Sequence, residues 1–213
     1  MSFSFPKVYP ILDAGVIPRA ERAEFLRRLG AELAEAGATL LEYRNKSGSD
    51  EELLADAAIL RATLPAPNIK LILDDRVDLV ERVGFDGVHV DAGDTTPADA
   101  RRLLGLERII GTFGGSEMLV PGILKEPVDY LSIGPILPTT TKQTTKAPIG
   151  VAGVRKLREQ AGPNVVLVAV GGVTLAEAPK ILEAGATVIG VAAAIFRSKD
   201  PAGEFRRWLH ALG

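Results

Sequence analysis

The stretch Val165-Val166-Leu167-Val168-Ala169-Val170-Gly171-Gly172 decides the fold of this chain. Six apolar residues in a row, with no alternating polar side, are typical of a parallel strand that is buried on both faces. The paired glycines permit a tight turn, and an amphipathic helical pattern follows over residues 175–183. Strand, turn and helix in this order form one βα unit.

The same unit recurs from one end of the chain to the other. Apolar runs predict strands over residues 8–12, 39–43, 69–73, 87–90, 108–111, 130–134, 165–170 and 187–191. The intervening patterns predict helices over 20–36, from Ser49-Asp50-Glu51-Glu52 onward, around 77–83, from Pro97 onward, weakly near 117–124, and over 151–160, 175–183 and 201–212.

Eight such units favour one closed barrel over an open sheet. A doubly wound open sheet would favour a G-x-G-x-x-G turn after the first strand, and the chain has Asp13-Ala14-Gly15-Val16 there. No linker or change of composition divides the chain. The sequence therefore predicts an α/β fold, a (β/α)₈ TIM barrel, with residues 1–213 as a single domain.

Composition excludes several classes of function. The chain has no cysteine and two histidines, His89 and His210, which argues against disulfides, thiolate sites and a Ser-His-Asp triad. The formal charge is −2, from 25 basic and 27 acidic residues, so a nucleic-acid partner is not expected. No apolar run reaches the roughly 18 residues of a membrane span, and no targeting segment is visible, so we expect a cytoplasmic protein with no membrane contact.

Polar residues follow most of the predicted strands, where TIM barrels carry their active sites. In chain order they are Asp13, Arg44-Asn45-Lys46, Asp74-Asp75-Arg76, Asp91 with Asp94, and Thr139-Thr140-Thr141-Lys142. Asp75 and Asp94 follow neighbouring strands and could share one Mg²⁺, although each could instead cap the helix after it. His89, inside its strand, is expected to be a hydrogen-bonded core histidine.

Cations and glycines in the same places suggest phosphate binding. Arg44 can donate two hydrogen bonds to phosphate oxygens, and Lys46 and Lys142 can act as mobile point charges; the alternative for each is a solvated surface cation. Gly171-Gly172, together with a small-residue helix start after the eighth strand, matches the usual barrel phosphate site. The alternative is a tight βα turn. The segment 139–146 is either a plain loop or a lid that brings hydroxyls and a cation to a phosphate.

Taken together, these motifs resemble the thiamine phosphate synthase family over nearly the whole chain. The segments that carry the likeness are Arg44-Asn45-Lys46, Asp75-Arg76, Gly87-Val88-His89-Val90 with Asp94, Gly134-Pro135-Ile136-Leu137-Pro138-Thr139-Thr140-Thr141-Lys142, and Val168-Ala169-Val170-Gly171-Gly172-Val173. The resemblance implies that hydroxymethylpyrimidine diphosphate and hydroxyethylthiazole phosphate are joined to give thiamine phosphate and diphosphate. The implied mechanism is dissociative and assisted by Mg²⁺: the diphosphate leaves first, and the thiazole nitrogen captures the pyrimidinylmethyl cation.

The resemblance also assigns roles to single residues. Arg44, Lys46 and Lys142 would hold the diphosphate, and Asp75 and Asp94 would bind Mg²⁺. The expected substrate-binding residues are Glu42, Asp74, Phe113, Thr139, Thr141, Gly172, Ala193 and Ala194, of which Thr139, Thr141, Gly172 and the backbone near Ala193-Ala194 would hold the thiazole phosphate. The implied partners are small phosphorylated molecules. Formation of a homo-oligomer is left open by the sequence.

Several of these positions depart from the family pattern. Glu42 stands where the family usually has Gln, Asp74 where it has Asn, Asp91-Ala92 where it has Gly-Gln, Phe113 where it has Ser, and Ala193-Ala194 where it has a pair such as Ile-Ser. The first three changes add acid where an anion should bind. Two alternatives to the synthase therefore stay open. One is an isomerase like the related thiazole tautomerase, and the other is a non-catalytic binder of a phosphorylated ligand.

Overall fold

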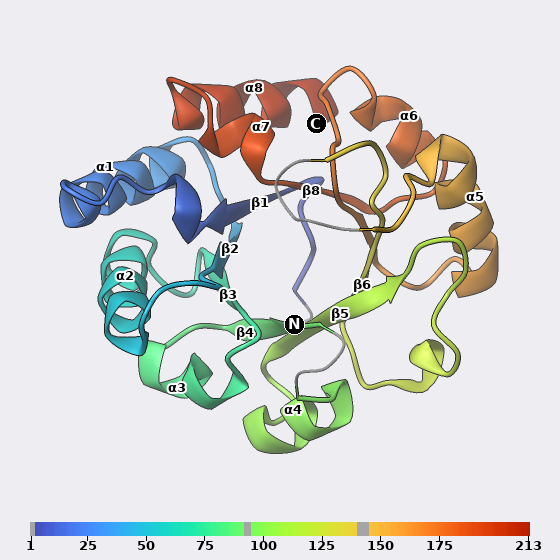
Figure 1. Ribbon diagram of the computed structural model, residues 1–213, viewed down its shortest axis with the longest axis horizontal. Coiled ribbons are helices and arrows are strands. Elements are labelled where there is room, and N and C mark those ends of the chain that lie inside the picture. Colours follow the sequence, from blue (N-terminus) through green and yellow to red (C-terminus); the bar gives the residue numbers. More distant parts are fainter. Residues whose placement is uncertain (1–2, 92–94, 140–144) are drawn as a thin grey trace.

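A computed structural model shows eight parallel strands that close into a barrel in chain order, surrounded by helices (Figure 1). The structure describes residues 3–91, 95–139 and 145–213. The strands are β1 (Val8–Asp13), β2 (Leu40–Arg44), β3 (Lys70–Asp74), β4 (Gly87–Val90), β5 (Ile109–Gly115), β6 (Tyr130–Ile133), β7 (Leu167–Ala169) and β8 (Val188–Val191). The predicted TIM barrel is confirmed, and β1 pairs with both β2 and β8.

The α-helices lie outside the ring of strands (Figure 1). They are α1 (Arg22–Glu35), α2 (Asp50–Thr63), α3 (Val80–Val83), α4 (Pro97–Leu104), α5 (Gly150–Ala161), α6 (Ala178–Glu183), α7 (Ala193–Phe196) and α8 (Pro201–Leu212). Short 3₁₀ turns are η1 (Ala14–Val16), η2 (Val77–Leu79) and η3 (Ile123–Lys125). Two predicted helix starts are confirmed: the Ser49 hydroxyl accepts a hydrogen bond from the Glu52 amide, and Pro97 lies in the first turn of α4.

The core has an inner and an outer layer. Side chains that point out of the barrel pack under the helices, and the indole of Trp208 on α8 is fully buried there. The inner layer is a separate cluster made of Tyr9, Leu40, Ile72, Ile109, Tyr130, Val168 and Val188. The segment before β1 reaches the middle of the ring, and its Phe3 and Phe5 pack against this inner cluster (Figure 1).

One glycine makes room for the largest ring inside the barrel. A Cβ atom on Gly111 of β5 would lie 1.9 Å from Cζ of Tyr130 on β6. No real Cβ tolerates such a contact, so a side chain at this position would push the tyrosine ring aside. Gly111 therefore allows the Tyr130 hydroxyl to reach across the barrel interior.

The fifth unit differs from the prediction. β5 continues to Gly115, four residues beyond the expected end, so Phe113 lies within the strand and not after it. The weak helix predicted near residues 117–124 is wrong: Gly115 bridges Leu119, and only the 3₁₀ turn η3 forms. Pro121 and the left-handed Gly122 (φ 82°) interrupt the stretch, which explains why no α-helix forms.

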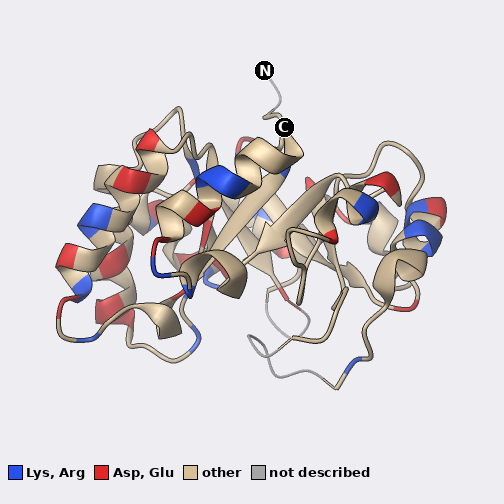
Figure 2. Cartoon of the chain, turned by 90° about the horizontal axis from the view of Figure 1, so that it is seen from above, with Lys and Arg blue, Asp and Glu red and all other residues tan. Residues whose placement is uncertain are grey.

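Charges of both signs are mixed over the outer helices (Figure 2). No helix within the described residues is both long and apolar enough to span a membrane.

Candidate active site

Charged side chains meet where β2 and β3 end. Arg44, the last residue of β2, contacts the Asp13 carboxylate through Nη1, and its Nε lies 3.4 Å from Oδ2 of Asp74. Lys46 contacts Asp75, and its Nζ lies 3.3 Å from the same Asp74 oxygen. Two cations and three carboxylates thus form one cluster at the carboxyl-terminal ends of the strands.

Asp75 adopts a backbone conformation that its residue type seldom takes. Its φ is 64°, and its amide donates a 2.8 Å hydrogen bond to the carbonyl of His89 on β4. The side chain does not cap η2, so the alternative of a capping role for Asp75 is wrong. The neighbouring Arg76 points away and pairs with Asp50 and Asp78. The backbone turn therefore directs Asp75, and not Arg76, into the cluster.

The carboxylates provide the donor type that Mg²⁺ prefers. Oδ1 of Asp75 is buried and has no hydrogen-bond partner among the described residues, as a metal ligand would be before it binds its ion. Within those residues no group of three or more His, Asp or Glu side chains is arranged to hold a metal. Asp94, the second predicted ligand, lies outside the described residues. The helix-capping role that the sequence also allowed for Asp94 belongs to Thr96, whose hydroxyl accepts a hydrogen bond from the Asp99 amide at the start of α4.

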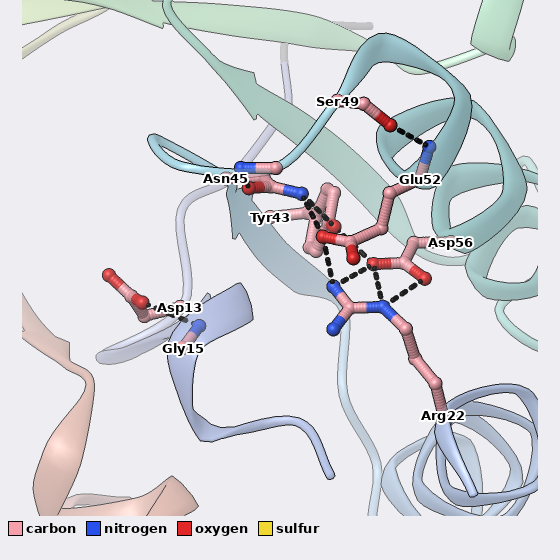
Figure 3. A network of polar contacts seen from close by, with 9 residues as sticks. Asp13, Gly15, Arg22, Tyr43, Asn45, Ser49, Glu52 and Asp56 are labelled. Carbon is pink, nitrogen blue, oxygen red and sulfur yellow. Dashed lines mark hydrogen bonds and ion pairs between the residues drawn. The ribbon is translucent and has the colours of Figure 1, made fainter. Parts of the chain in front are cut away.

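A second network, on the outer face of β2, holds the loop that carries Lys46 (Figure 3). Arg22 of α1 donates to both oxygens of the buried Asp56 on α2, and the Tyr43 hydroxyl donates to Oδ2 of Asp56. Asn45 donates from Nδ2 to the Tyr43 hydroxyl at 3.1 Å and accepts from the Gly48 amide at 2.7 Å. Because Asn45 is anchored outward, the loop around it is fixed to α1 and α2.

Glu42 lies two residues before Arg44 on β2, so both face the barrel interior. It is 5% exposed and accepts a 2.9 Å hydrogen bond from the Tyr9 hydroxyl. Burial, followed by the charge of Asp74, raises the pKa of Glu42 to about 8, although the Tyr9 hydrogen bond and Arg44 act in the opposite direction. A group with this pKa changes its charge near neutral pH.

His89 is buried, as predicted, and its Nδ1 lies 3.0 Å from the Tyr130 hydroxyl. Its Nε2 lies 3.8 Å from Oδ1 of Asp91. Phe113, also predicted in the site, lies under a cation: Nζ of Lys146 is 3.7 Å from the centre of its ring. A cation from the segment 139–146 thus reaches β5, although Lys142 and Thr141 of this segment lie outside the described residues.

The predicted phosphate-binding residues lie at the ends of two paired strands. Gly172 follows β7 in a left-handed conformation (φ 70°), and a Cβ there would lie 2.4 Å from the carbonyl oxygen of Pro138. Ala193 and Ala194 begin the short α7 after β8, which pairs with β7. Thr139 is half-buried. The structure therefore brings Gly172, Ala193 and Ala194 to neighbouring strand ends.

Two tyrosines that sequence reasoning did not place in the site belong to it, and Asp13, which it placed at a strand end without a role, has one. Asp13 holds Arg44, and Tyr9 and Tyr130 bridge Glu42 to His89 with 3.1 Å between the two hydroxyl oxygens. Strand alternation could have placed Tyr9 on the same face as Asp13. No local signal links Tyr9 with Tyr130, because they are 121 residues apart.

Comparisons with known proteins identify the family of this chain. A family model described as "Thiamine monophosphate synthase" matches residues 8–195. The thiamine-phosphate synthase of Koribacter versatilis is 36% identical over 207 residues and covers 97% of both chains. The corresponding protein of Chloroflexus aurantiacus is 34% identical over 194 residues, covering 91% of this chain and 87% of its own.

Solved structures give the same result. The thiamine phosphate pyrophosphorylase from Pyrococcus furiosus superposes with a TM-score of 0.74 at 28% identity, with 97% of both chains covered. A 3-hexulose-6-phosphate synthase, at 17% identity and a TM-score of 0.63 over 97% of this chain and 100% of its own, shares the fold alone. The match of the family model and of these relatives over most of the chain shows that this chain belongs to the thiamine monophosphate synthase family.

Proposed function

We propose that this chain is an active thiamine-phosphate synthase, a transferase that takes hydroxymethylpyrimidine diphosphate and hydroxyethylthiazole phosphate as substrates. The carbon–oxygen bond between the pyrimidinylmethyl group and the diphosphate breaks. The thiazole nitrogen then supplies the electron pair for the new carbon–nitrogen bond, and diphosphate is released. No nucleophilic side chain is required, and the residues that favour the reaction are those that stabilise the leaving group.

The observation that carries the proposal is the position of Arg44 and Lys46 at the same end of the barrel, at and just after the end of β2. Arg44 can offer a two-pronged set of donors to a diphosphate. The Lys46 side chain is 37% exposed, so it can move from Asp75 to a phosphate oxygen. Lys142 of the threonine-rich segment would add a third charge. These groups would bind and neutralise the diphosphate as it leaves.

Asp75 and Asp94 would hold Mg²⁺ in this site. Oδ1 of Asp75, which is buried and has no hydrogen-bond partner in the part of the chain that the structure describes, supports the assignment, as does the order of the sequence, in which the two residues follow neighbouring strands. When bound, the ion would supply positive charge to the diphosphate oxygens.

The phosphate of the thiazole substrate would lie at the ends of β7 and β8. Gly172, Ala193 and Ala194 lie there, where TIM barrels usually bind phosphate. Thr139 and Thr141 would add hydroxyl donors, and Phe113 would offer a ring face to a heteroaromatic substrate.

The decisive experiment is an assay for thiamine phosphate with both substrates and Mg²⁺. Product formation that needs both substrates and releases diphosphate is the expected result. Binding of either phosphorylated substrate without any product would instead identify a non-catalytic binding protein. Isomerisation of a thiazole substrate in the absence of the pyrimidine would identify a tautomerase.

A further inference from the structure

Four polar side chains from four strands form a continuous chain inside the barrel. Glu42 of β2 is joined to Tyr9 of β1 at 2.9 Å, Tyr9 to Tyr130 of β6 at 3.1 Å, and Tyr130 to Nδ1 of His89 on β4 at 3.0 Å. Both tyrosines are 1% exposed. The family resemblance implies that Glu42 binds substrate, but the function proposed above gives no role to any of these four side chains.

The hydrogen bonds in this series of side chains all run in one direction. Tyr9 donates its one hydroxyl proton to Oε2 of Glu42, so the oxygen of Tyr9 can only accept from Tyr130. The oxygen of Tyr130 in turn can accept from the Nδ1–H group of His89. Burial, followed by the charge of Glu42, raises the pKa of both tyrosines well above the usual value, so both keep their protons. Oε2 of Glu42 is therefore fixed as the final acceptor in this series of hydrogen bonds.

The other oxygen of Glu42 has no such partner. Among the residues that the structure describes, Oε1 has no hydrogen-bond partner, and no cation forms an ion pair with Glu42 within 4.0 Å. The groups that act on this carboxyl are Tyr9, Tyr130, Arg44, Asp74 and Asp91, and His89 lies behind Tyr130. Two of them are further carboxylates, and the guanidinium of Arg44 is already shared between Asp13 and Asp74. A buried carboxylate in this position is costly unless it takes up a proton.

We propose that Glu42 contacts the pyrimidine as a neutral carboxylic acid with its proton on Oε1, and that Tyr9, Tyr130 and His89 are positioning residues that hold Oε2 as the acceptor. The proposal rests on the function proposed above. A neutral carboxyl offers one donor and one acceptor side by side, as an amide does. A ring nitrogen and an adjacent amino group on a pyrimidine match that pair: the acid donates to the ring nitrogen and accepts from the amine.

The test is the affinity for the pyrimidine alcohol, without diphosphate or Mg²⁺, measured by calorimetry across the alkaline range. Wild-type affinity should fall about tenfold per pH unit above the pKa of Glu42. In Glu42→Gln the affinity should not depend on pH in this range. Tyr9→Phe removes a donor to the carboxylate, so the fall should begin at higher pH. Tyr9→Phe in the Glu42→Gln background should no longer alter the profile.

The matched control is Thr112→Val. It removes another buried hydroxyl, on β5, but this hydroxyl donates to the backbone carbonyl of Val90 and not to Glu42 or its partners. The profile of this variant should follow the wild type. Infrared difference spectra provide a second readout: the carbonyl stretch of a protonated carboxyl should be present near neutral pH and absent in Glu42→Gln.

Two results would overturn the proposal. The first is a wild-type affinity for the pyrimidine alcohol that does not fall at alkaline pH, or that falls equally in Glu42→Gln. The second is a pH profile of affinity in Tyr9→Phe that is identical to the wild-type profile. The product assay separates this failure from failure of the proposed function. If thiamine phosphate forms but binding of the pyrimidine alcohol does not depend on pH, only the inference about Glu42 is refuted. If no product forms although the pyrimidine binds with the expected profile, only the proposed reaction is removed.

Discussion

Nε of Arg44 lies 3.4 Å from Oδ2 of Asp74, while Nη1 of the same guanidinium contacts Asp13. The cation best suited to bind a diphosphate is thus already shared between two carboxylates. An incoming diphosphate must compete with them, because like charges close together repel. The resemblance to the family implies an amide at position 74 and another at position 42. Asp74 therefore reduces the positive field that the substrate meets, and Glu42 does so only at pH values above its raised pKa.

The double variant Glu42→Gln/Asp74→Asn tests this competition. We expect kcat/KM for the pyrimidine diphosphate to rise by about tenfold or more, since one charge-assisted hydrogen bond contributes about 1.5–3 kcal/mol. The gain should be larger at high pH, where Glu42 is ionised in the wild type. Steady-state kinetics across the pH range provide the measurement. A double variant slower than the wild type at every pH would mean that the acids serve a different ligand.

Diphosphate binding should require Mg²⁺. Diphosphate is expected to raise the melting temperature of the protein with Mg²⁺ and not with EDTA, because binding to the folded state stabilises it. Thermal denaturation under the two conditions checks this. Asp75→Asn should abolish the Mg²⁺-dependent shift, whereas an equal shift in EDTA would count against a metal at Asp75.

Lys142 should act on the leaving group and not as a Schiff-base lysine. Lys142→Ala is expected to reduce kcat strongly and to leave the KM for thiazole phosphate nearly unchanged, because its neighbours in the sequence are threonines and a glutamine, which suit phosphate and not the apolar pocket that activates a Schiff-base lysine. Lys125→Ala, on the exposed turn η3, is the control. Covalent trapping of substrate on Lys142 by borohydride would contradict the prediction.

The outer network of β2 should be essential for stability. Arg22→Ala would leave the Asp56 carboxylate, whose side chain is 2% exposed, without the one cation that pairs with it among the described residues. Loss of one partner of a buried ion pair costs about 3–5 kcal/mol, and urea unfolding should show a loss of this size. Arg207→Ala removes an exposed partner of Glu204 and should change stability by less than about 0.5 kcal/mol. Equal effects in both variants would refute the role of the network.

The periodic and local features of this chain could be predicted from its sequence. The eight apolar runs, the Ser49 cap and the first-turn Pro97 all lie where their patterns indicate, because each depends on a few neighbouring residues. The same is true of Arg44, Lys46 and Asp75, since the end of a parallel strand fixes the position of the residues that follow.

Features that depend on distant residues could not be predicted. Phe113 was expected after its strand, but β5 extends to Gly115 because it pairs with β6. The Tyr9–Tyr130 contact and the space that Gly111 leaves for the Tyr130 ring exist only once the barrel closes. In the sequence Asp75 precedes a helix that it could cap, and only its positive φ shows that its side chain turns to Lys46.

The buried Glu42 should also make folding stability depend on pH. Its pKa is raised from an ordinary carboxyl value to about 8 in the folded protein, so the folded state holds a proton that the unfolded state has released. The resulting stabilisation is complete below the unfolded pKa and is lost as pH rises towards 8. Between these limits the unfolding free energy of the wild type should fall relative to Glu42→Gln by up to about 1.4 kcal/mol per pH unit. Urea unfolding of both proteins at several pH values measures the difference, and Glu35→Gln, on the exposed face of α1, should follow the wild type. Parallel curves for the wild type and Glu42→Gln would show that Glu42 does not hold a proton in the folded state.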